Sequence, residues 1–493
     1  MKAYDSESDM MKSIDQFTEL LHFVEVESKK LDAYTVEKKV FQKILDLGLS
    51  LMKVYFTERS AELGNHRKIE GGDGVEYQRE RIRTRPYFSI FGELTIERLC
   101  FRHQGKGSII PLDGAVNLPE RTYSYFLQEM MCSLSQRMPF GEEMGFFKKF
   151  FGHSFSPRSL ETVNRDVAAS YDTFYDETRP EPVKPEGEIQ VVSFDGKGVP
   201  MVKEEIARRK ARLGKGEKNQ KKLEALAGVS YTIDQHERTA EEVVGNLFQD
   251  EPAKPKDEKK PIPHAGNKVV TVSLEKPKEA VMEFIVEDVA ARTRGNAKEM
   301  VCVLDGARSL WLKCRKLFPQ ATFILDIIHV LEYLWSAAHV YNKAESEEAR
   351  QWVRDHLLMI LTGKVGQVIK GLKLSLARRR KLTKDQQKTL RKVISYFDRN
   401  KRGMAYDKYL QKGFPIASGV VESVCGHVVK DRMEGSGMRW KIPSAEAMLR
   451  LRSLTASQHF DLFFAAHMNQ QRIRLHDSKK WNPSEDNDSS RAA

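Results

Sequence analysis

Apolar residues recur every three or four positions through the first sixty residues of the chain. The segments FTELLHFVEVESKKL and VFQKILDLGLSLMKVYF therefore predict helices between about Ser13 and Leu63. From Ile82 to Arg102, apolar and polar residues alternate around a Phe-Gly-Glu turn, which is typical of a β-hairpin. We expect a helical N-terminal region at 1–70, followed by a hairpin region at 71–118.

Residues 119–178 return to a helical pattern that is broken by a glycine. After the break, Ser156 and Pro157 are typical of a helix N-cap and of the first helical turn. Two helices joined by a short turn are the outline of a helix-turn-helix, whose second helix reads DNA. Arg158 and Arg165 would face outward on that second helix, although many helix pairs of this shape bind nothing.

From Ile189 the pattern changes to short apolar runs that alternate with helical segments. Strands are predicted at IQVVSFD, LAGVSYTID, VVTVSL, MVCVLD and TFILDIIH, and helices of about ten or more residues separate the later ones. Alternation of this kind indicates an α/β sheet. The pattern is helical from His329 to the end, and the polar tail at 477–493 is expected to be disordered.

The charge balance favours a polyanionic partner. The chain has 81 Lys and Arg residues against 69 Asp and Glu, a formal net charge of +12, and nucleic acid is the commonest partner of such proteins. Two runs of one sign could contact a phosphate backbone, or could simply be solvated faces. Their central residues are Arg208, Arg209, Lys210, Arg378, Arg379 and Arg380.

Cysteine spacing and hydropathy exclude several classes of protein. The 5 cysteines form no Cys-x-x-Cys pair, so neither a disulfide framework nor a cysteine zinc site is indicated. The N-terminus lacks the apolar core of a signal peptide, and no apolar run approaches the length of a membrane span. We expect a cytoplasmic protein without a membrane partner.

Three acidic residues stand where the expected strands and helices end or begin. Asp195 ends the run VVSFD, and the chain is expected to turn at the two glycines that follow; Asp305 ends VCVLD and also precedes a glycine. Glu422 begins a probable helix. Ligands gather at strand ends in α/β sheets, and three carboxylates could hold two Mg²⁺ ions for phosphoryl transfer. Each acid alone could equally be a turn residue or a first-turn helix acid.

Four motifs in order carry a resemblance to a known family. VVSFDGKGVPM, VCVLDGARSLW, FPQATFILDIIHVLEYLW and FPIASGVVESVCGHVVKDRMEGSGMRW resemble those of DDE transposases of bacterial insertion sequences, of the ISKra type and related to Mutator-like transposases. The resemblance implies an α/β RNase H-like catalytic core at 188–329 that is completed by final helices at 413–476. It also implies an all-helical insertion at 330–412 that interrupts this core, after a mostly helical N-terminal DNA-binding region.

The resemblance assigns roles to the acids. It implies that Asp195, Asp305 and Glu422 are catalytic and bind two Mg²⁺ ions, for which Mn²⁺ could substitute. Asp326 and His329 match an Asp/Cys-x-x-His signature of these families. As the end of a strand, the histidine could touch the scissile DNA, or it could only bond the backbone.

Three basic residues after the third acid could also reach a phosphate: Lys430, Arg432 and Arg439. Lys430 follows Glu422 by two turns of an α-helix, which would place both near the same face. In relatives, a cysteine zinc knuckle tends to precede the sequence PLD. Only Cys100 and His103 stand there in this chain, so no zinc is expected.

The resemblance therefore implies a transposase that cleaves transposon ends and joins their 3′-hydroxyls to target DNA. Its partners would be terminal inverted repeats, target DNA and further copies of the chain, in a homodimer or larger synaptic complex on the bacterial nucleoid. Two alternatives stay open at this point. An RNase H-like nuclease would cut without joining, and a domesticated transposase would bind DNA without catalysis.

Overall fold

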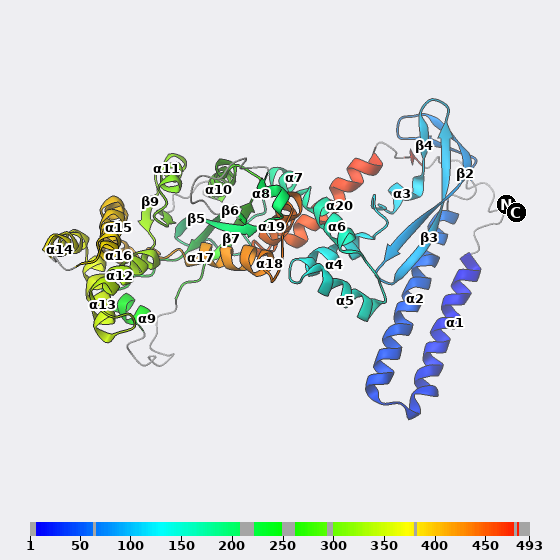
Figure 1. Cartoon of the computed structure of the whole chain (residues 1–493). Helices are drawn as coiled ribbons and strands as arrows, with labels where there is room; N and C mark the ends of the chain where they lie inside the picture. The colour runs from blue at the N-terminus through cyan, green and yellow to red at the C-terminus, as the bar shows by residue number, and fades with distance from the viewer. Residues whose placement is uncertain are drawn as a thin grey trace. The chain divides into compact units, whose positions relative to one another are not determined.

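The computed structural model describes residues 6–62, 66–207, 221–248, 262–292, 299–378, 382–477 and 481–482. Its mixed α and β elements form two compact units, of which the first comprises 1–176 with 461–493 and the second comprises 177–460. Figure 1 shows the elements of both units. The predicted mixed α/β class and the helical N-terminal region are confirmed.

The first unit begins with a helical hairpin. Helix α1 (Ser6–Glu25) packs against α2 (Ala33–Ala61), with a short 3₁₀ turn, η1 (Glu27–Lys30), between them. Asp32 caps α2, because its carboxylate accepts a hydrogen bond from the Thr35 N–H at 3.0 Å. The helices predicted between Ser13 and Leu63 are therefore present.

A sheet follows the hairpin in the first unit. Its strands are β1 (Lys68–Gly71), β2 (Glu76–Ser89), β3 (Gly92–His103), β4 (Gly107–Ile109) and β10 (Trp481–Asn482), in the antiparallel order β10-β1-β2-β3-β4. The pairing of β2 with β3 confirms the predicted hairpin. The core beneath the sheet includes Phe56 of α2 with Ile96 and Phe101 of β3. Strand β10 corrects the expectation that the end of the chain is wholly helical.

The helix-turn-helix outline is also present in the first unit. After the short α3 (Pro111–Ala115) come α4 (Tyr125–Ser135), α5 (Phe140–Phe151), α6 (Pro157–Ala168) and α7 (Tyr171–Glu177). Gly152 ends α5 in the left-handed conformation at φ 72°, which glycine adopts without strain. Ser156 caps α6 by accepting a hydrogen bond from the Ser159 N–H, as the sequence predicts. The long α20 (Phe460–His476) belongs to this unit from Asp461 onward, whereas it was expected beside residues 413–460.

The second unit contains a five-stranded sheet in the order β7-β6-β5-β8-β9. The strands are β5 (Ile189–Pro200), β6 (Lys222–Ile233), β7 (Gly266–Ser273), β8 (Glu299–Leu304) and β9 (Thr322–Leu325). Strands β8 and β9 run parallel to β5, while β6 runs antiparallel to both β5 and β7. Most side chains of β5, β6 and β8 are buried, which explains their continuous apolar runs.

Strand β5 does not turn after Asp195. It continues to Pro200, with Gly196 opposite Leu226 and Gly198 opposite Glu224 on β6. A Cβ atom on Gly196 would lie 2.3 Å from the Glu224 Oε1, so this glycine makes room for a side chain that crosses over β5. The predicted turn is wrong, because glycine here serves close packing within a strand.

Helices surround this sheet and extend beyond it. Helix α10 (Lys278–Arg292) packs against β5, β6 and β7, and α19 (Ile442–Ala456) packs against β7. The other helices before β9 are α8 (Lys203–Ala207), α9 (Ala240–Phe248) and α11 (Arg308–Leu317). Among the described helices, none is both long and apolar enough to span a bilayer.

A run of helices separates β9 from the last part of the second unit. It consists of α12 (Ile327–Tyr341), α13 (Glu347–Leu361), α14 (Val365–Arg378), α15 (Lys384–Asn400), η3 (Lys401–Gly403) and α16 (Tyr406–Gln411). Helices α12 to α15 pack against one another. Three short helical elements follow: α17 (Gly419–Val424), the π-helical turn η4 (Cys425–Lys430) and α18 (Asp431–Met433).

Candidate active site

Three aspartates are brought together by the register of the parallel strands. Phe194 pairs with Leu304 across β5 and β8, and Leu304 pairs with Leu325 across β8 and β9. The residue that follows each of these three positions is an aspartate. The backbone N–H of Asp326, which follows Leu325, donates to the Leu304 carbonyl at 2.9 Å. One edge of the sheet thus carries Asp195, Asp305 and Asp326 side by side.

Asp195 and Asp305 are half-buried carboxylates with few partners. The Asp195 Oδ1 accepts from the Gly196 N–H at 2.7 Å, and the Asp305 Oδ1 accepts from the Ala307 N–H at 2.9 Å. Burial raises the pKa of the Asp305 carboxyl, and the negative charge of Asp195 adds to this rise. The two carboxylates are therefore close enough to repel each other, as expected of a site that holds cations.

Asp326 and His329 form an ion pair at the start of α12. Asp326 is the N-cap, and its Oδ2 accepts from the His329 N–H at 3.2 Å and lies 2.7 Å from His329 Nδ1. The hydrogen bond to Asp326 raises the pKa of His329 to about 9. Burial raises the pKa of Asp326, but the hydrogen bonds from His329 and Ser418 outweigh burial and lower it overall. The expectation that Asp-Ile-Ile-His ends a strand is wrong: the three-residue spacing is that of a helix cap.

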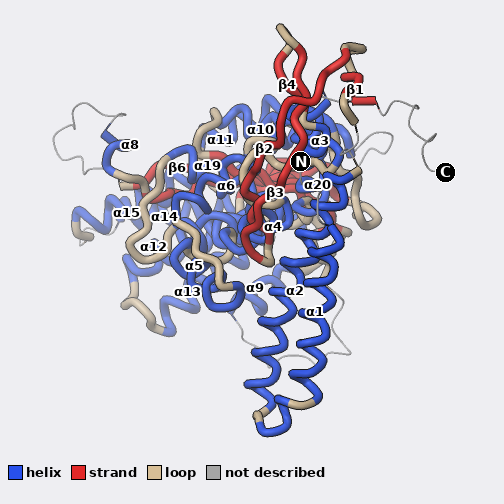
Figure 2. Tube along the Cα trace, turned by 90° about the vertical axis from the view of Figure 1, so that its right-hand side faces the viewer, coloured by secondary structure: helices blue, strands red, loops and turns tan. Residues whose placement is uncertain are grey.

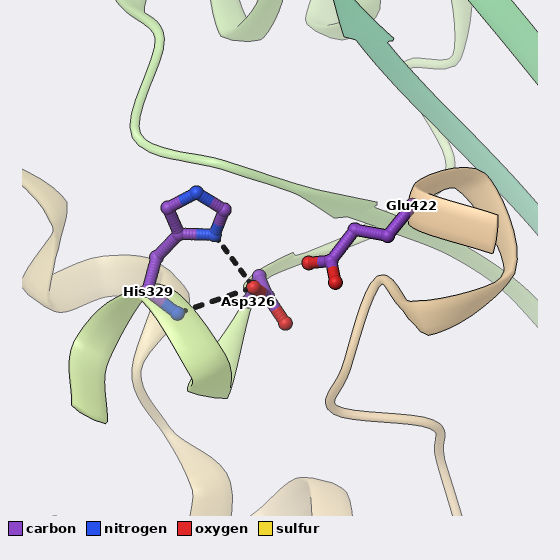
Figure 3. Close-up of side chains that lie close together, drawn as sticks. All are labelled: Asp326, His329 and Glu422. Atoms are coloured by element: carbon purple, nitrogen blue, oxygen red, sulfur yellow. Dashed lines mark hydrogen bonds and ion pairs between the residues drawn. The ribbon is translucent and has the colours of Figure 1, made fainter. Parts of the chain in front are cut away.

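Glu422 reaches the same place from α17. The Ser418 N–H donates to the Asp326 Oδ1 at 2.9 Å, and the Ser418 hydroxyl donates to the Glu422 Oε1 at 2.9 Å. Ligand atoms of Asp326, His329 and Glu422 all lie within 4.8 Å of one another. Figure 3 shows the Glu422 carboxylate directed toward Asp326, while the His329 Nε2 points away from both acids.

Cys425 links Glu422 to Asp195 and was not anticipated from the sequence. It lies one turn after Glu422, and its buried thiol donates a hydrogen bond to Asp195; burial first, and then that carboxylate, raise the pKa of the thiol. Both α17 and the π-helical turn pack against β5. Asp195 and Glu422 therefore lie on elements that pack against each other, whereas the ligand atoms found within 4.8 Å of Glu422 are those of Asp326 and His329.

Tyr396 is a second residue that the sequence did not single out. A Cβ atom on Gly306 would lie 2.1 Å from its ring, so Gly306 is the residue that lets α15 approach the end of β8. Tyr396 stacks on Tyr333 at 3.8 Å and is 5% exposed. Its hydroxyl has no hydrogen-bond partner among the described residues. Burial, together with the charges of Asp305 and Asp326, raises the pKa of Tyr396.

The basic residues after Glu422 differ in accessibility. Lys430 and Arg439 are exposed, whereas Arg432 is 3% exposed and lies 5.0 Å from the centre of the Trp440 ring. Arg432 is therefore packed inside the unit rather than displayed toward DNA. The argument that put Lys430 on the face of Glu422 is also wrong, because residues 425–430 form a π-helix and not the α-helix it assumed.

The two basic runs lie mostly outside the described residues. Arg378 is exposed at the end of α14. Nothing is described for the rest of these runs, namely Arg208, Arg209, Lys210, Arg379 and Arg380.

A hollow of about 990 Å³ lies in the first unit beside the helix-turn-helix. Its walls include Arg158, Ser159 and Thr162 of α6 and Gln471 and Arg474 of α20. Hydroxyl, amide and guanidinium groups are the side chains that read base edges. Arg165 is exposed on α6 but is not part of this wall.

Residues 233–413 match the family model DDE_Tnp_ISL3, described as a transposase. The match covers less than half of the chain; it includes Asp305, Asp326 and His329 but neither Asp195 nor Glu422. It supports a transposase function, and it leaves the ISKra type and the Mutator-like relation as predictions.

Other comparisons add little. No curated protein matches the chain. The Drosophila P element transposase strand transfer complex resembles it at 10% sequence identity with a TM-score of 0.24, over 73% of this chain and 94% of that chain. A TM-score this low does not indicate a shared fold.

Proposed function

We propose that the chain is a DDE transposase whose catalytic acids are Asp195, Asp305 and Glu422. The observation that carries the proposal is the register of β5 and β8, which puts the first two acids at one sheet edge, with Glu422 on a helix packed against the same strand. These acids lie far apart in the sequence, so chance would seldom bring them together. The match of residues 233–413 to a transposase family supports the same conclusion.

The sheet supports an RNase H-like core. Three consecutive strands, β5, β6 and β7, form an antiparallel meander, and two further strands extend it in parallel on the other side of β5. On this reading, the helices from α12 to α16 are the insertion expected at 330–412. That insertion also supplies Tyr396, which closes over Gly306 beside Asp305.

The donor set suits hard divalent cations. Carboxylate oxygens are the ligands that Mg²⁺ and Mn²⁺ prefer. Asp195, Asp305 and Glu422 each accept few hydrogen bonds, and the Glu422 carboxylate lies within 4.8 Å of ligand atoms of Asp326 and His329. Asp195, Asp305 and Glu422 would hold the ions. When bound, two such ions activate water and stabilise the attacking and leaving oxygens of an in-line displacement. Mutual repulsion of neighbouring carboxylates, as between Asp195 and Asp305, favours cation binding.

Asp326 and His329 play a different part in this proposal. Asp326 holds the imidazole through Nδ1 and holds the α17 loop through Ser418. The Nε2 edge of His329 points away from the acids. We place a DNA phosphate against this edge, where an N–H donor fixes the scissile strand without taking a metal position.

We place recognition of the element's ends at the hollow beside α6 and contacts to the DNA backbone at exposed basic residues. Arg158 lines the hollow and Arg165 flanks it. The exposed candidates in the second unit are Arg378, Lys430 and Arg439. Contacts of this kind are measured by the salt dependence of DNA binding, because each lost phosphate contact lowers the slope by about 1.

A single assay separates transposition from the rival functions. Labelled duplexes taken from DNA on either side of the gene are incubated with the full chain, Mg²⁺ and a supercoiled target plasmid. Joined product supports a transposase. Cut product without joining would identify a nuclease, and a mobility shift alone would identify a DNA-binding protein; either result would overturn the proposal.

The matched variants are Asp195→Asn and Asp398→Asn. Asp195 lies in the acid cluster, whereas Asp398 is exposed on α15 and pairs only with Lys373 in the described structure. The first change is expected to abolish both cleavage and joining, and the second to leave them intact. Full joining activity in Asp195→Asn would show that the catalytic assignment is wrong.

A further inference from the structure

One face of helix α1 carries a row of large apolar side chains that no described residue covers. Met10, Ile14, Phe17, Leu21 and Val24 follow one another at spacings of four and three residues, and each is between 44% and 54% exposed. This spacing places them in one strip, like positions a and d of a coiled coil. Soluble proteins seldom leave a continuous strip of this kind in water unless a partner covers it.

The face of α1 that packs against α2 is more polar than this exposed strip. Asp9 accepts a hydrogen bond from the Lys53 Nζ at 2.7 Å, and Ser13 is buried between the two helices. Only Leu20 and Phe23 make the inner face apolar near the turn of the hairpin. In this hairpin, whose backbone Figure 2 shows, α1 therefore turns polar side chains toward α2 and leaves its longer apolar strip exposed.

Helix α2 adds exposed apolar side chains of its own. Ile44, Leu51 and Tyr55, spaced by seven and four residues, are between 44% and 49% exposed. With the strip of α1 they expose on the order of 800 Å², the area that each partner contributes to a standard protein interface. The hairpin thus carries enough apolar surface for a stable contact.

We infer that the α1–α2 hairpin binds the same hairpin of a second copy of this chain. The charges of the two helices are complementary. Helix α1 has five acidic side chains against one lysine, and α2 has five basic side chains against three acidic ones. A two-fold axis between two copies sets the acidic helix of each hairpin against the basic helix of the other.

Other occupants fit this surface less well. The acidic α1 repels DNA phosphates and anionic lipid headgroups, which excludes a nucleic acid or a membrane as its partner. Residues 483–493, PSEDNDSSRAA, include no large apolar side chain that could fill the row. A second hairpin supplies both the apolar residues and the opposite charge.

The experiment measures the mass of the full chain by sedimentation velocity at micromolar concentration. The wild type is expected to be a dimer. Phe17→Glu with Leu21→Glu puts charges in the middle of the strip and is expected to weaken the dimer roughly 100-fold or more, since central anchors dominate an interface. Lys12→Glu changes the net charge of α1 by the same amount off the strip, and it is expected to stay dimeric.

A milder pair guards against misfolding. Phe17→Ala with Leu21→Ala shortens the same side chains and keeps helix propensity high, so its circular dichroism should match that of the wild type while its dimer weakens. A monomeric wild type would overturn the inference, as would an alanine pair that dimerises as tightly as the wild type. Binding of a monomeric wild type to lipid vesicles or to another protein would also count against it.

The interface stands on the hairpin alone; only its use in holding two DNA ends together rests on the proposed function. Asp195→Asn should therefore dimerise like the wild type. Dimers that join no DNA would overturn the proposed function and leave the interface. Monomers that still nick end DNA would overturn the interface and leave the acid cluster.

Discussion

Two acids at the ends of strands β7 and β8 of the second unit, the buried Glu446 and the half-buried Asp305, differ in their hydrogen bonds. Glu446 on α19 reaches the end of β7, where its carboxylate accepts from the Ser273 hydroxyl, the Leu274 and Glu275 N–H groups and the Arg450 guanidinium. Asp305 follows β8 and accepts from the Ala307 N–H, next to the like charge of Asp195. Hydrogen bonds from the protein compensate the charge of Glu446, whereas Asp305 faces a second negative charge.

The difference lies in how far hydrogen bonds from the protein compensate each negative charge. Glu446 fastens α19 to the loop after β7, so its negative charge is already compensated. Asp305 leaves acceptor capacity unused in a half-buried place, which costs stability unless a cation binds. Burial alone therefore does not distinguish the two acids, whereas the hydrogen bonds that their oxygens accept do.

The largest effect is expected from Asp305→Asn. It should lower joining of end DNA by about 1,000-fold or more, because a metal-binding carboxylate contributes several kcal/mol to the transition state. In EDTA the same variant should unfold at the same or a higher denaturant concentration than the wild type, since the repulsion with Asp195 is removed. A variant that is both active and destabilised would make Asp305 a structural acid like Glu446.

Glu446→Gln should have the opposite profile. An amide nitrogen would face the Leu274 and Glu275 N–H groups, and the ion pair of Glu446 with Arg450 would be lost, so unfolding of the second unit should become easier by about 3 kcal/mol. Joining per folded molecule should stay unchanged. Urea denaturation measures the first effect, and Glu283→Gln on the exposed side of α10 is the control, with an expected change below about 0.5 kcal/mol.

Gly306→Ala tests how Tyr396 frames Asp305. The new methyl group would overlap the Tyr396 ring, and we expect a loss of roughly 1–3 kcal/mol. In the double variant Gly306→Ala with Tyr396→Ala, the losses of stability measured for the two single variants should not add. The new methyl group then has no Tyr396 ring to displace. Additive losses would mean that the two residues are not in contact.

The smallest effect extends the comparison to a histidine of the first unit. His467 is buried, its Nδ1 lies 2.8 Å from the Ser170 hydroxyl, and burial lowers its pKa from 6.5 to about 4. The neutral form therefore stabilises the unit above pH 6.5, and this stability is lost as the pH falls toward 4. At about pH 5.5, protonation in the unfolded state lowers the free energy of unfolding of the wild type by about 1 kcal/mol, and His467→Gln should abolish this decrease.

Hydrogen exchange of α4 and α20 amides at a series of pH values measures this effect. His22→Gln is the control, because that side chain is 61% exposed and has no buried environment to lose. An unchanged pH dependence in His467→Gln would show that another group, rather than His467, titrates between pH 6.5 and 4.

Strand and helix positions were largely readable from the sequence because burial imposes its period directly. The runs around Val192, Val229 and Val303 became β5, β6 and β8. Local capping was also legible: Ser156 with Pro157 begins α6 as expected. The geometry of the candidate site was harder to predict from the sequence. A turn was predicted at Gly196 because a sequence does not distinguish a glycine that makes room for a neighbouring side chain, here Glu224, from a glycine that allows a turn.

Residues that act through contacts distant in sequence left no signal. Tyr396 belongs to a helix with an ordinary amphipathic pattern, and only the approach of α15 to Gly306 reveals its position. Arg432 reads as a surface cation until Trp440 covers it. The π-helical turn after Glu422 breaks the 3.6-residue period on which any prediction of helix faces depends.

The order of the strands has a consequence for the chain as it is synthesised. Asp195 emerges early, but β5 acquires its parallel neighbour only after residue 299 has been made, and Glu422 arrives later still. Contacts so distant in sequence form late and slowly during folding. A truncated translation product that ends before α17 therefore lacks Glu422 and the contacts that α17 makes with β5.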